Sequence, residues 1–272
     1  MENLSKAICE LKHEFVKSYD GNSHTTEILP NFPSSKIQID DKHLSLLHKF
    51  LKNNPIYSNL ITAEILGTEC TIFEGDLNNY WIDSIKHDAS YAPFYPTWLL
   101  SAMSLAIEAQ NIGYEQIIDI GSGDGRIAYC AKVLGLDSIS IEIDENLTDL
   151  QQSISRKTGI MFNPICFDAT VFDFRKIPKK KSIFVIGGVP EIGEVLAESV
   201  VKNALESPNL ENPSFILTGS HSHRKFSRDP THFGWGRTIK KFQLSVISAI
   251  SLPTYWTMDQ EFETPYIFTK KE

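Results

Sequence analysis

The chain lacks a long apolar run, a cysteine pattern and an excess of positive charge. It has 272 residues, and no run of about 18 apolar residues occurs among them, so we expect no membrane span. The four cysteines form no C-x-x-C pair, which argues against a disulfide framework and a structural zinc site: Cys9, Cys70, Cys130 and Cys166. With 26 basic against 34 acidic residues, the surface as a whole is not built to attract nucleic acid.

The N-terminal stretch also lacks a signal-peptide pattern. Charged residues recur through MENLSKAICELKHEF, so the apolar core of a secretory signal is missing. Internal repeats and low-complexity tracts are absent as well. These features predict a cytoplasmic protein, long enough for one substantial core with an appendage.

The most informative stretch is Gln116–Asp144, which reads QIIDIGSGDGRIAYCAKVLGLDSISIEID. It opens with an apolar run that fits a buried parallel strand. Three glycines then recur at alternate positions: Gly121, Gly123 and Gly125. A helix-like run, Arg126–Leu134, and a second apolar run that carries Glu142 follow. Strand, glycine-rich turn, helix and strand predict one βαβ unit of a doubly wound α/β sheet.

The glycine-rich turn indicates a bound ligand with a ribose. Glycine permits positive φ and close approach of a ligand, while N–H groups at the following helix start are free to meet polar ligand groups. Glu142, at the end of the second strand, is placed to accept hydrogen bonds from both ribose hydroxyls. Dinucleotide sites favour G-x-G-x-x-G. Here the third glycine comes one residue early and Asp119 precedes the first, so a dinucleotide site and a purely structural turn are the weaker interpretations.

The string Asp119–Gly125, D-I-G-S-G-D-G, resembles motif I of class I S-adenosylmethionine (SAM) methyltransferases. That resemblance implies an enzyme with a doubly wound, mostly parallel seven-stranded Rossmann-like sheet and SAM as cofactor. It implies cofactor contacts from the turn and from neighbouring strand ends: Asp119, Gly121, Ser122, Gly123, Gly125, Glu142, Asp168, Ala169 and Gly187. Asp168 is expected to accept from the adenine amino group, with a loop-capping role as the alternative.

Residues 1–86 predict a small, mainly helical N-terminal module. Two apolar stripes at helical spacing run over Leu4–Phe15 and Leu44–Leu51. Ser18–Pro33 is rich in Asn, Ser, Gly and Pro and is predicted to be a loop, and Ile61–Phe73 a strand pair. The module is either a packing extension or a cap that selects the substrate.

Residues 87–272 predict the SAM-dependent methyltransferase domain. Helices are expected over three further ranges: Thr97–Gln110, Asn146–Lys157 and Ile192–Glu206. Strands are expected over five more: Phe162–Phe167, Ser182–Ile186, Ser214–Thr218, Gln243–Ser251 and Pro265–Lys270. The last two fit the antiparallel pair that closes a class I methyltransferase sheet.

Two aromatic segments are the candidates for substrate contact. His87–Trp98 is dense in aromatic residues and proline, and Tyr91 and Tyr95 are the candidate catalytic residues, in the sense of orienting the substrate. The alternative is that these rings only fasten the module to the sheet. Gly219–Lys241 carries six basic residues against one acidic residue, and it suits an anionic substrate or a stacked base. Phe226, Phe233 and Trp235 lie within it. Its two histidines, His221 and His223, lack nearby carboxylates, so no metal is expected.

The acceptor of the methyl group is predicted only through a narrower resemblance. Gly121–Arg126, Glu142–Asp144 and Tyr91–Pro93 resemble the archaeal and mitochondrial protein-lysine methyltransferases related to the Dot1 type, which implies a protein lysine. Gly187–Glu191 departs from that group and keeps an RNA or small-molecule acceptor open. No Asn/Asp-Pro-Pro-Tyr string follows the fourth strand, and the chain is acidic, so nucleic acid is not favoured. A non-catalytic SAM-binding protein is the remaining hypothesis.

Overall fold

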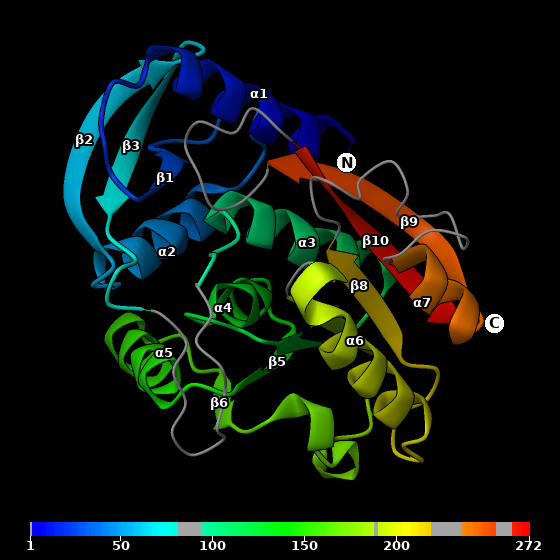
Figure 1. Ribbon diagram of the computed structural model, residues 1–272. Helices are drawn as coiled ribbons and strands as arrows, with labels where there is room; N and C mark the ends of the chain where they lie inside the picture. Colours follow the sequence, from blue (N-terminus) through cyan, green and yellow to red (C-terminus); the bar gives the residue numbers. More distant parts are fainter. Residues whose placement is uncertain (1, 81–93, 188–189, 219–234, 254–262) are drawn as a thin grey trace.

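The computed structural model describes residues 2–80, 94–187, 190–218, 235–253 and 263–272. These ranges form a large central sheet flanked by helices and a small second sheet near the N-terminus (Figure 1). None of the helices among the described residues is long and apolar enough to cross a membrane.

The central sheet has seven strands: β4 (Gln116–Ile120), β5 (Asp137–Glu142), β6 (Asn163–Cys166), β7 (Ser182–Ile186), β8 (Ser214–Thr218), β9 (Leu244–Pro253) and β10 (Glu263–Lys271). Their order is β6-β5-β4-β7-β8-β10-β9. Strands β4 to β8 pair in parallel, and β10 runs antiparallel to both β8 and β9. The predicted doubly wound, mostly parallel sheet is confirmed, with β9 and β10 as its closing pair.

Apolar side chains at alternate positions along the strands contribute to two hydrophobic cores, one on each face of the sheet. Ile117 and Ile183 face the core that includes α3 (Leu99–Ile112) and α4 (Arg126–Val133). Their chain neighbours Ile118 and Phe184 face the other core, which includes α6 (Pro190–Leu205) and α7 (Trp235–Lys241). Near-continuous apolar runs in the strands follow from burial on both faces.

The predicted helices are present, with boundaries shifted by one to two residues. Asp144 caps the start of α5 (Glu145–Thr158), because its side chain accepts from the Leu147 N–H at 2.9 Å. Gly159, at φ +74°, ends the helix. Both are the ordinary signals for helix ends. Cys130 is buried in α4, as expected, and all four cysteines are free thiols.

The N-terminal module combines two helices with a three-stranded antiparallel sheet: α1 (Glu2–Ser18), β1 (Thr25–Pro30), α2 (Asp41–Lys52), β2 (Tyr57–Ile65) and β3 (Thr68–Gly75). The strand order is β1-β3-β2. The β2–β3 hairpin confirms the predicted strand pair and turns at Leu66 and Gly67, both at positive φ.

The loop prediction over Ser18–Pro33 is wrong, because Thr25–Pro30 forms β1 and pairs with β3. The module is therefore less helical than predicted. All six residues of β1 are buried, including the charged Glu27, although Asn, Ser, Gly and Pro around the strand had predicted a loop. A strand with a buried carboxylate needs a distant partner for that charge, which the local pattern cannot show.

The module does not have a core of its own. A single cluster of buried side chains runs from α1, α2, β1 and β3 into α3, α4 and the sheet. α1 packs against β9 and α3, and α2 packs against α4 and α5 (Figure 1). Lys49 of α2 donates to the Thr158 carbonyl at 2.7 Å, and Tyr129 of α4 donates to the Leu46 carbonyl at 2.8 Å.

Candidate functional site

The glycine-rich turn links the end of β4 to the start of α4. Gly121, Gly123 and Gly125 all have positive φ, at +64°, +56° and +79°. Among the described residues, a side chain at Gly121 would meet nothing within 4 Å, so the described part of the structure leaves space beside the backbone there. A Cβ at Gly123 would lie 2.1 Å from the Phe94 ring, which is packed on the turn. Gly121 is thus the point where a ligand can approach the backbone.

Glu142, the last residue of β5, is bonded to that turn. Its Oε2 accepts from the Gly123 N–H at 2.7 Å, and its Oε1 accepts from the N–H groups of Ile143 (2.8 Å) and Asp144 (3.2 Å). Burial raises the pKa of Glu142 to about 7, against the three backbone donors, which favour the ionised form. A carboxylate accepts about four hydrogen bonds, so capacity remains for a ligand hydroxyl.

Asp119 lies inside β4, beneath the turn. Its Oδ2 accepts from the Ala128 N–H in α4 at 3.3 Å. Burial raises its pKa to about 8, and the nearby carboxyls of Glu142 and Asp124 push it the same way. The raised pKa of Asp119 favours its protonated form, and its hydrogen bond joins the strand to the helix.

Ser122 directs its hydroxyl into the protein interior. It lies 2.6 Å from the Ser140 hydroxyl and accepts from Gln151 Nε2 at 3.0 Å. Gln151, on α5, also donates to the Gly123 carbonyl at 2.7 Å. The side chain of Ser122 therefore supports the shape of the turn, and only its backbone is placed beside the open space at Gly121.

Asp168 and Ala169 follow β6, on the other side of β5 from the turn. Oδ1 of Asp168 accepts from the Thr170 N–H at 2.8 Å and from its hydroxyl at 2.7 Å. The side chain thus caps the short 3-10 turn η1 (Ala169–Val171), which was the alternative interpretation. Asp168 is half-buried and Ala169 is buried. Oδ2 is the oxygen that remains for an outside donor.

Gly187 follows β7 and lies against the glycine-rich turn. Its N–H donates to the Ile120 carbonyl at 3.0 Å. A Cβ at Gly187 would lie 3.1 Å from the Gly121 carbonyl oxygen, so a larger residue would push the two loops apart. The ends of β4, β5 and β7 consequently meet at one edge of the sheet, the usual place for ligands in doubly wound folds.

The candidate substrate residues are placed only in part. Tyr91 lies outside the described residues, as do His221, His223, Phe226 and Phe233. Tyr95 is described and is 40% exposed, which leaves its ring accessible. Trp235, predicted within a basic loop, is instead buried at the start of α7, where its indole N–H donates to the Thr218 carbonyl. It is not available to stack a base.

Within the described part of the chain, no three His, Cys, Asp or Glu side chains gather as a metal site. Three of the six basic residues in the predicted basic segment, Arg224, Lys225 and Arg228, lie outside the described residues. Lys241 pairs with Glu198 at 2.6 Å, and Arg237 and Lys240 are exposed on the short helix α7.

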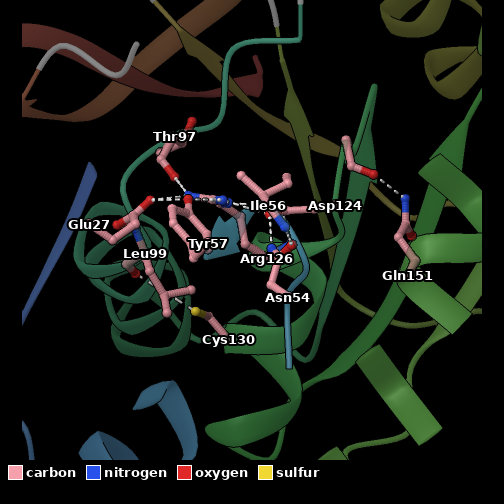
Figure 2. A network of polar contacts seen from close by, with 11 residues as sticks. Glu27, Asn54, Ile56, Tyr57, Thr97, Leu99, Asp124, Arg126, Cys130 and Gln151 are labelled. Atoms are coloured by element: carbon pink, nitrogen blue, oxygen red, sulfur yellow. Dashed lines mark hydrogen bonds and ion pairs between the residues drawn. The ribbon is translucent and has the colours of Figure 1, made fainter. Parts of the chain in front are cut away.

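A buried polar network beside the turn was missed by sequence analysis. Figure 2 shows Arg126, the first residue of α4, at its centre. Its guanidinium donates to Asp124 through Nε (2.8 Å) and Nη2 (2.6 Å) and also donates to Glu27 of β1. Burial opposes its charge, but Asp124, Tyr57 and Glu27 hold the pKa of Arg126 well above the usual value. The D-G-R string was visible in the sequence, whereas the pairing of its arginine with Glu27 was not.

No family model matches the chain, and no curated protein matches it. TYW2 from P. horikoshii, solved in complex with MeSAdo, has 14% identity and a TM-score of 0.42 over 58% of this chain and 56% of that chain. TrmN from Thermus thermophilus has 14% identity and a TM-score of 0.48 over 64% of this chain and 49% of that chain. An O-methyltransferase from Bacillus cereus, in complex with SAH, has 13% identity and a TM-score of 0.48 over 66% and 84%.

The chain thus spans about half the length of the TYW2 and TrmN chains that it resembles. At these identities the likeness concerns the fold alone. The strand order and the reversed β10 define the fold of this chain independently as a doubly wound, mostly parallel α/β sheet closed by an antiparallel pair. The site at its ligand edge combines a glycine-rich turn, a carboxylate and a second approaching glycine.

Proposed function

We propose that this chain is a SAM-dependent methyltransferase. The observation that carries the proposal is the open backbone at Gly121 next to the carboxylate of Glu142, both at the carboxyl ends of central parallel strands. A ligand with a ribose fits this pair, since two adjacent hydroxyls can donate to one carboxylate. Asp168 adds a half-buried carboxylate beyond β6 that suits an amino group.

SAM, when bound, supplies a methyl group on a sulfonium that is already a good leaving system. The remaining work of the protein is alignment of the acceptor, which is an orientation effect. We therefore assign binding rather than proton transfer to Gly121, Glu142 and Asp168. Tyr95, with its exposed ring, remains the described candidate for orienting the substrate.

For the acceptor, we propose a protein lysine, on the resemblance of Gly121–Arg126 and Glu142–Asp144 to lysine methyltransferases. A lysine ammonium would have to lose a proton to water before reaction, because the free lone pair of the amine is needed to form the new N–C bond as the bond from the methyl carbon to sulfur breaks and its electron pair stays on sulfur. Partial desolvation lowers the pKa of an amine in this way. For the RNA alternative, the described part of the basic segment offers no exposed aromatic ring at Trp235, which is buried.

The test is incubation of the purified protein with methyl-labelled SAM and cell extract separated into protein, RNA and small-molecule fractions. We expect label in the protein fraction, absent with Glu142→Gln and retained with Asp149→Asn, an exposed acid on α5. Label in RNA or small molecules would contradict the lysine acceptor. SAM binding without label in any fraction would favour a non-catalytic SAM-binding protein.

A further inference from the structure

The network around Arg126 connects parts of the chain that lie far apart in sequence. Glu27 is 99 residues away from Arg126, and Asn54 is 70 residues away from Asp124. Glu27, Asp124 and Arg126 are exposed by 1%, 0% and 2%. Charges buried to this degree are retained only where their partners satisfy them.

One end of the network lies within the glycine-rich turn. Asp124 stands between Gly123 and Gly125, and its two oxygens hold the Arg126 guanidinium (Figure 2). Asn54, at the end of α2, donates to Asp124 Oδ2 at 2.8 Å. The turn is thus tied to the N-terminal module through a side chain of its own.

The other end fixes the start of α3. Glu27 Oε2 accepts from the Leu99 N–H at 2.8 Å, which caps that helix from β1. Arg126 also donates to the Thr97 carbonyl (Figure 2). A few residues earlier, the Phe94 ring packs on Gly123. The segment 94–99 and the glycine-rich turn are therefore held by the same pair of charges.

Tyr57 completes the arrangement from β2. Its hydroxyl accepts from Arg126 Nη2 at 3.1 Å and lies 3.3 Å from Glu27 Oε1, to which it donates. All three guanidinium nitrogens of Arg126 donate hydrogen bonds. Their acceptors come from β1, β2, the residues just before α3 and the glycine-rich turn. In other proteins, well-packed apolar side chains often replace a buried ion pair without loss of stability, so a buried network of this kind is weak evidence for a role in stability alone.

We propose that Arg126 is a positioning residue through which the N-terminal module sets the shape of the cofactor turn. The module is thereby a working part of the cofactor site, in addition to a packing extension. This inference rests on the proposed function for the identity of the ligand, SAM. Its structural part, that Glu27 and Arg126 hold residues 121–125 in place, stands on the ligand-free protein.

The experiment compares Glu27→Gln with Ile28→Val, its neighbour in β1, which is equally buried but makes no polar contact with the turn. Two readouts are taken: the affinity for S-adenosylhomocysteine by calorimetry, and hydrogen exchange of the peptide that spans the turn in the ligand-free protein. We expect Glu27→Gln to weaken affinity about tenfold, within the range of couplings through packed networks. Turn amides should exchange faster, whereas Ile28→Val leaves both readouts unchanged at a comparable melting temperature.

Tyr57→Phe is the milder second variant, because it removes a single hydroxyl from Arg126, and it should shift both readouts in the same direction by less. If Glu27→Gln and Tyr57→Phe both show the same exchange and the same affinity as Ile28→Val, Arg126 does not position the turn. If the unsubstituted protein does not bind S-adenosylhomocysteine, the proposed function fails. The exchange comparison then still decides whether the network holds the turn.

Discussion

At the residue scale, the buried carboxyls of Glu142 and Asp119 lie near the same turn but differ in the number of backbone N–H groups that donate to them. Glu142 receives three backbone N–H groups and Asp119 receives one. Burial raises the pKa of both, to about 7 and about 8. Glu142 is thus the better prepared to carry charge toward a ligand, and Asp119 the better suited to remain neutral inside the strand.

Replacement of Glu142 by Gln should weaken SAM binding about 10- to 100-fold, since hydrogen bonds to a charged group are worth about 1.5–3 kcal/mol. The amide keeps the shape of the side chain but turns one acceptor into a donor that faces backbone N–H groups. Calorimetry of Glu142→Gln beside Asp149→Asn measures the effect. Unchanged affinity would remove Glu142 from the cofactor site.

The ligand-free protein should lose stability as pH rises from about 4 to about 8. Because the pKa values of Asp119 and Glu142 are raised, the folded state keeps protons that the unfolded chain releases in this window. Each group contributes a slope of at most about 1.4 kcal/mol per pH unit. Urea unfolding of Asp119→Asn at several pH values should show a shallower decline than the unsubstituted protein. An equal decline in both proteins would show that Asp119 titrates normally.

At the element scale, the glycine-rich turn has two different reasons for its glycines. The open space at Gly121 leaves room for a ligand, whereas Gly123 leaves room for Phe94. Positive φ alone costs an alanine about 1–2 kcal/mol at either position. The contact with Phe94 adds a steric cost at Gly123 only.

We therefore expect Gly121→Ala to lower stability by about 1–2 kcal/mol, the cost of the backbone conformation, and to reduce SAM binding. Gly123→Ala should destabilise the protein further, since its Cβ would lie 2.1 Å from the Phe94 ring. Chemical denaturation of both variants, with Gly135→Ala (φ +81°, open space) as the control, measures the difference. Equal losses in Gly121→Ala and Gly123→Ala would contradict the role of Phe94.

Sequence patterns predicted the elements whose signals are local. The stop at Gly159 and the turn at Gly67 lie within a few residues of the elements that they end. β1 was missed because Asn, Ser, Gly and Pro around it predict a loop, and the partner of its buried Glu27 comes 99 residues later. The inward hydroxyl of Ser122 was missed for the same reason, since Ser140 and Gln151 lie on other elements.

At the scale of the whole molecule, the N-terminal module and the central sheet share one core. Buried side chains of α1 and α2 belong to the cluster that also includes α3, α4 and the strands. Two domains joined by a small interface would open separately. The predicted boundary near residue 86 therefore separates segments of sequence, and we propose that it does not separate folding units.

Thermal unfolding should accordingly occur in one transition, with the same midpoint by far-UV circular dichroism and by tryptophan fluorescence. The described tryptophans sample both faces of the sheet, since Trp98 precedes α3 and Trp235 begins α7. Saturating SAM at about 100 times its Kd should add about 2.7 kcal/mol to the free energy of unfolding. Two separate midpoints would show that the module unfolds on its own.

The long separation between Glu27 and Arg126 also has a consequence for synthesis on the ribosome. The N-terminal strand emerges first, and its acidic side chain must stay hydrated until the arginine has been added. At 5–20 residues per second, the 99 intervening residues take about 5 to 20 s. During that interval, Glu27 of β1 lacks the arginine that neutralises its charge in the folded protein. The glycine-rich turn and the polar contacts of β1 with it thus become complete together, once Arg126 has been added.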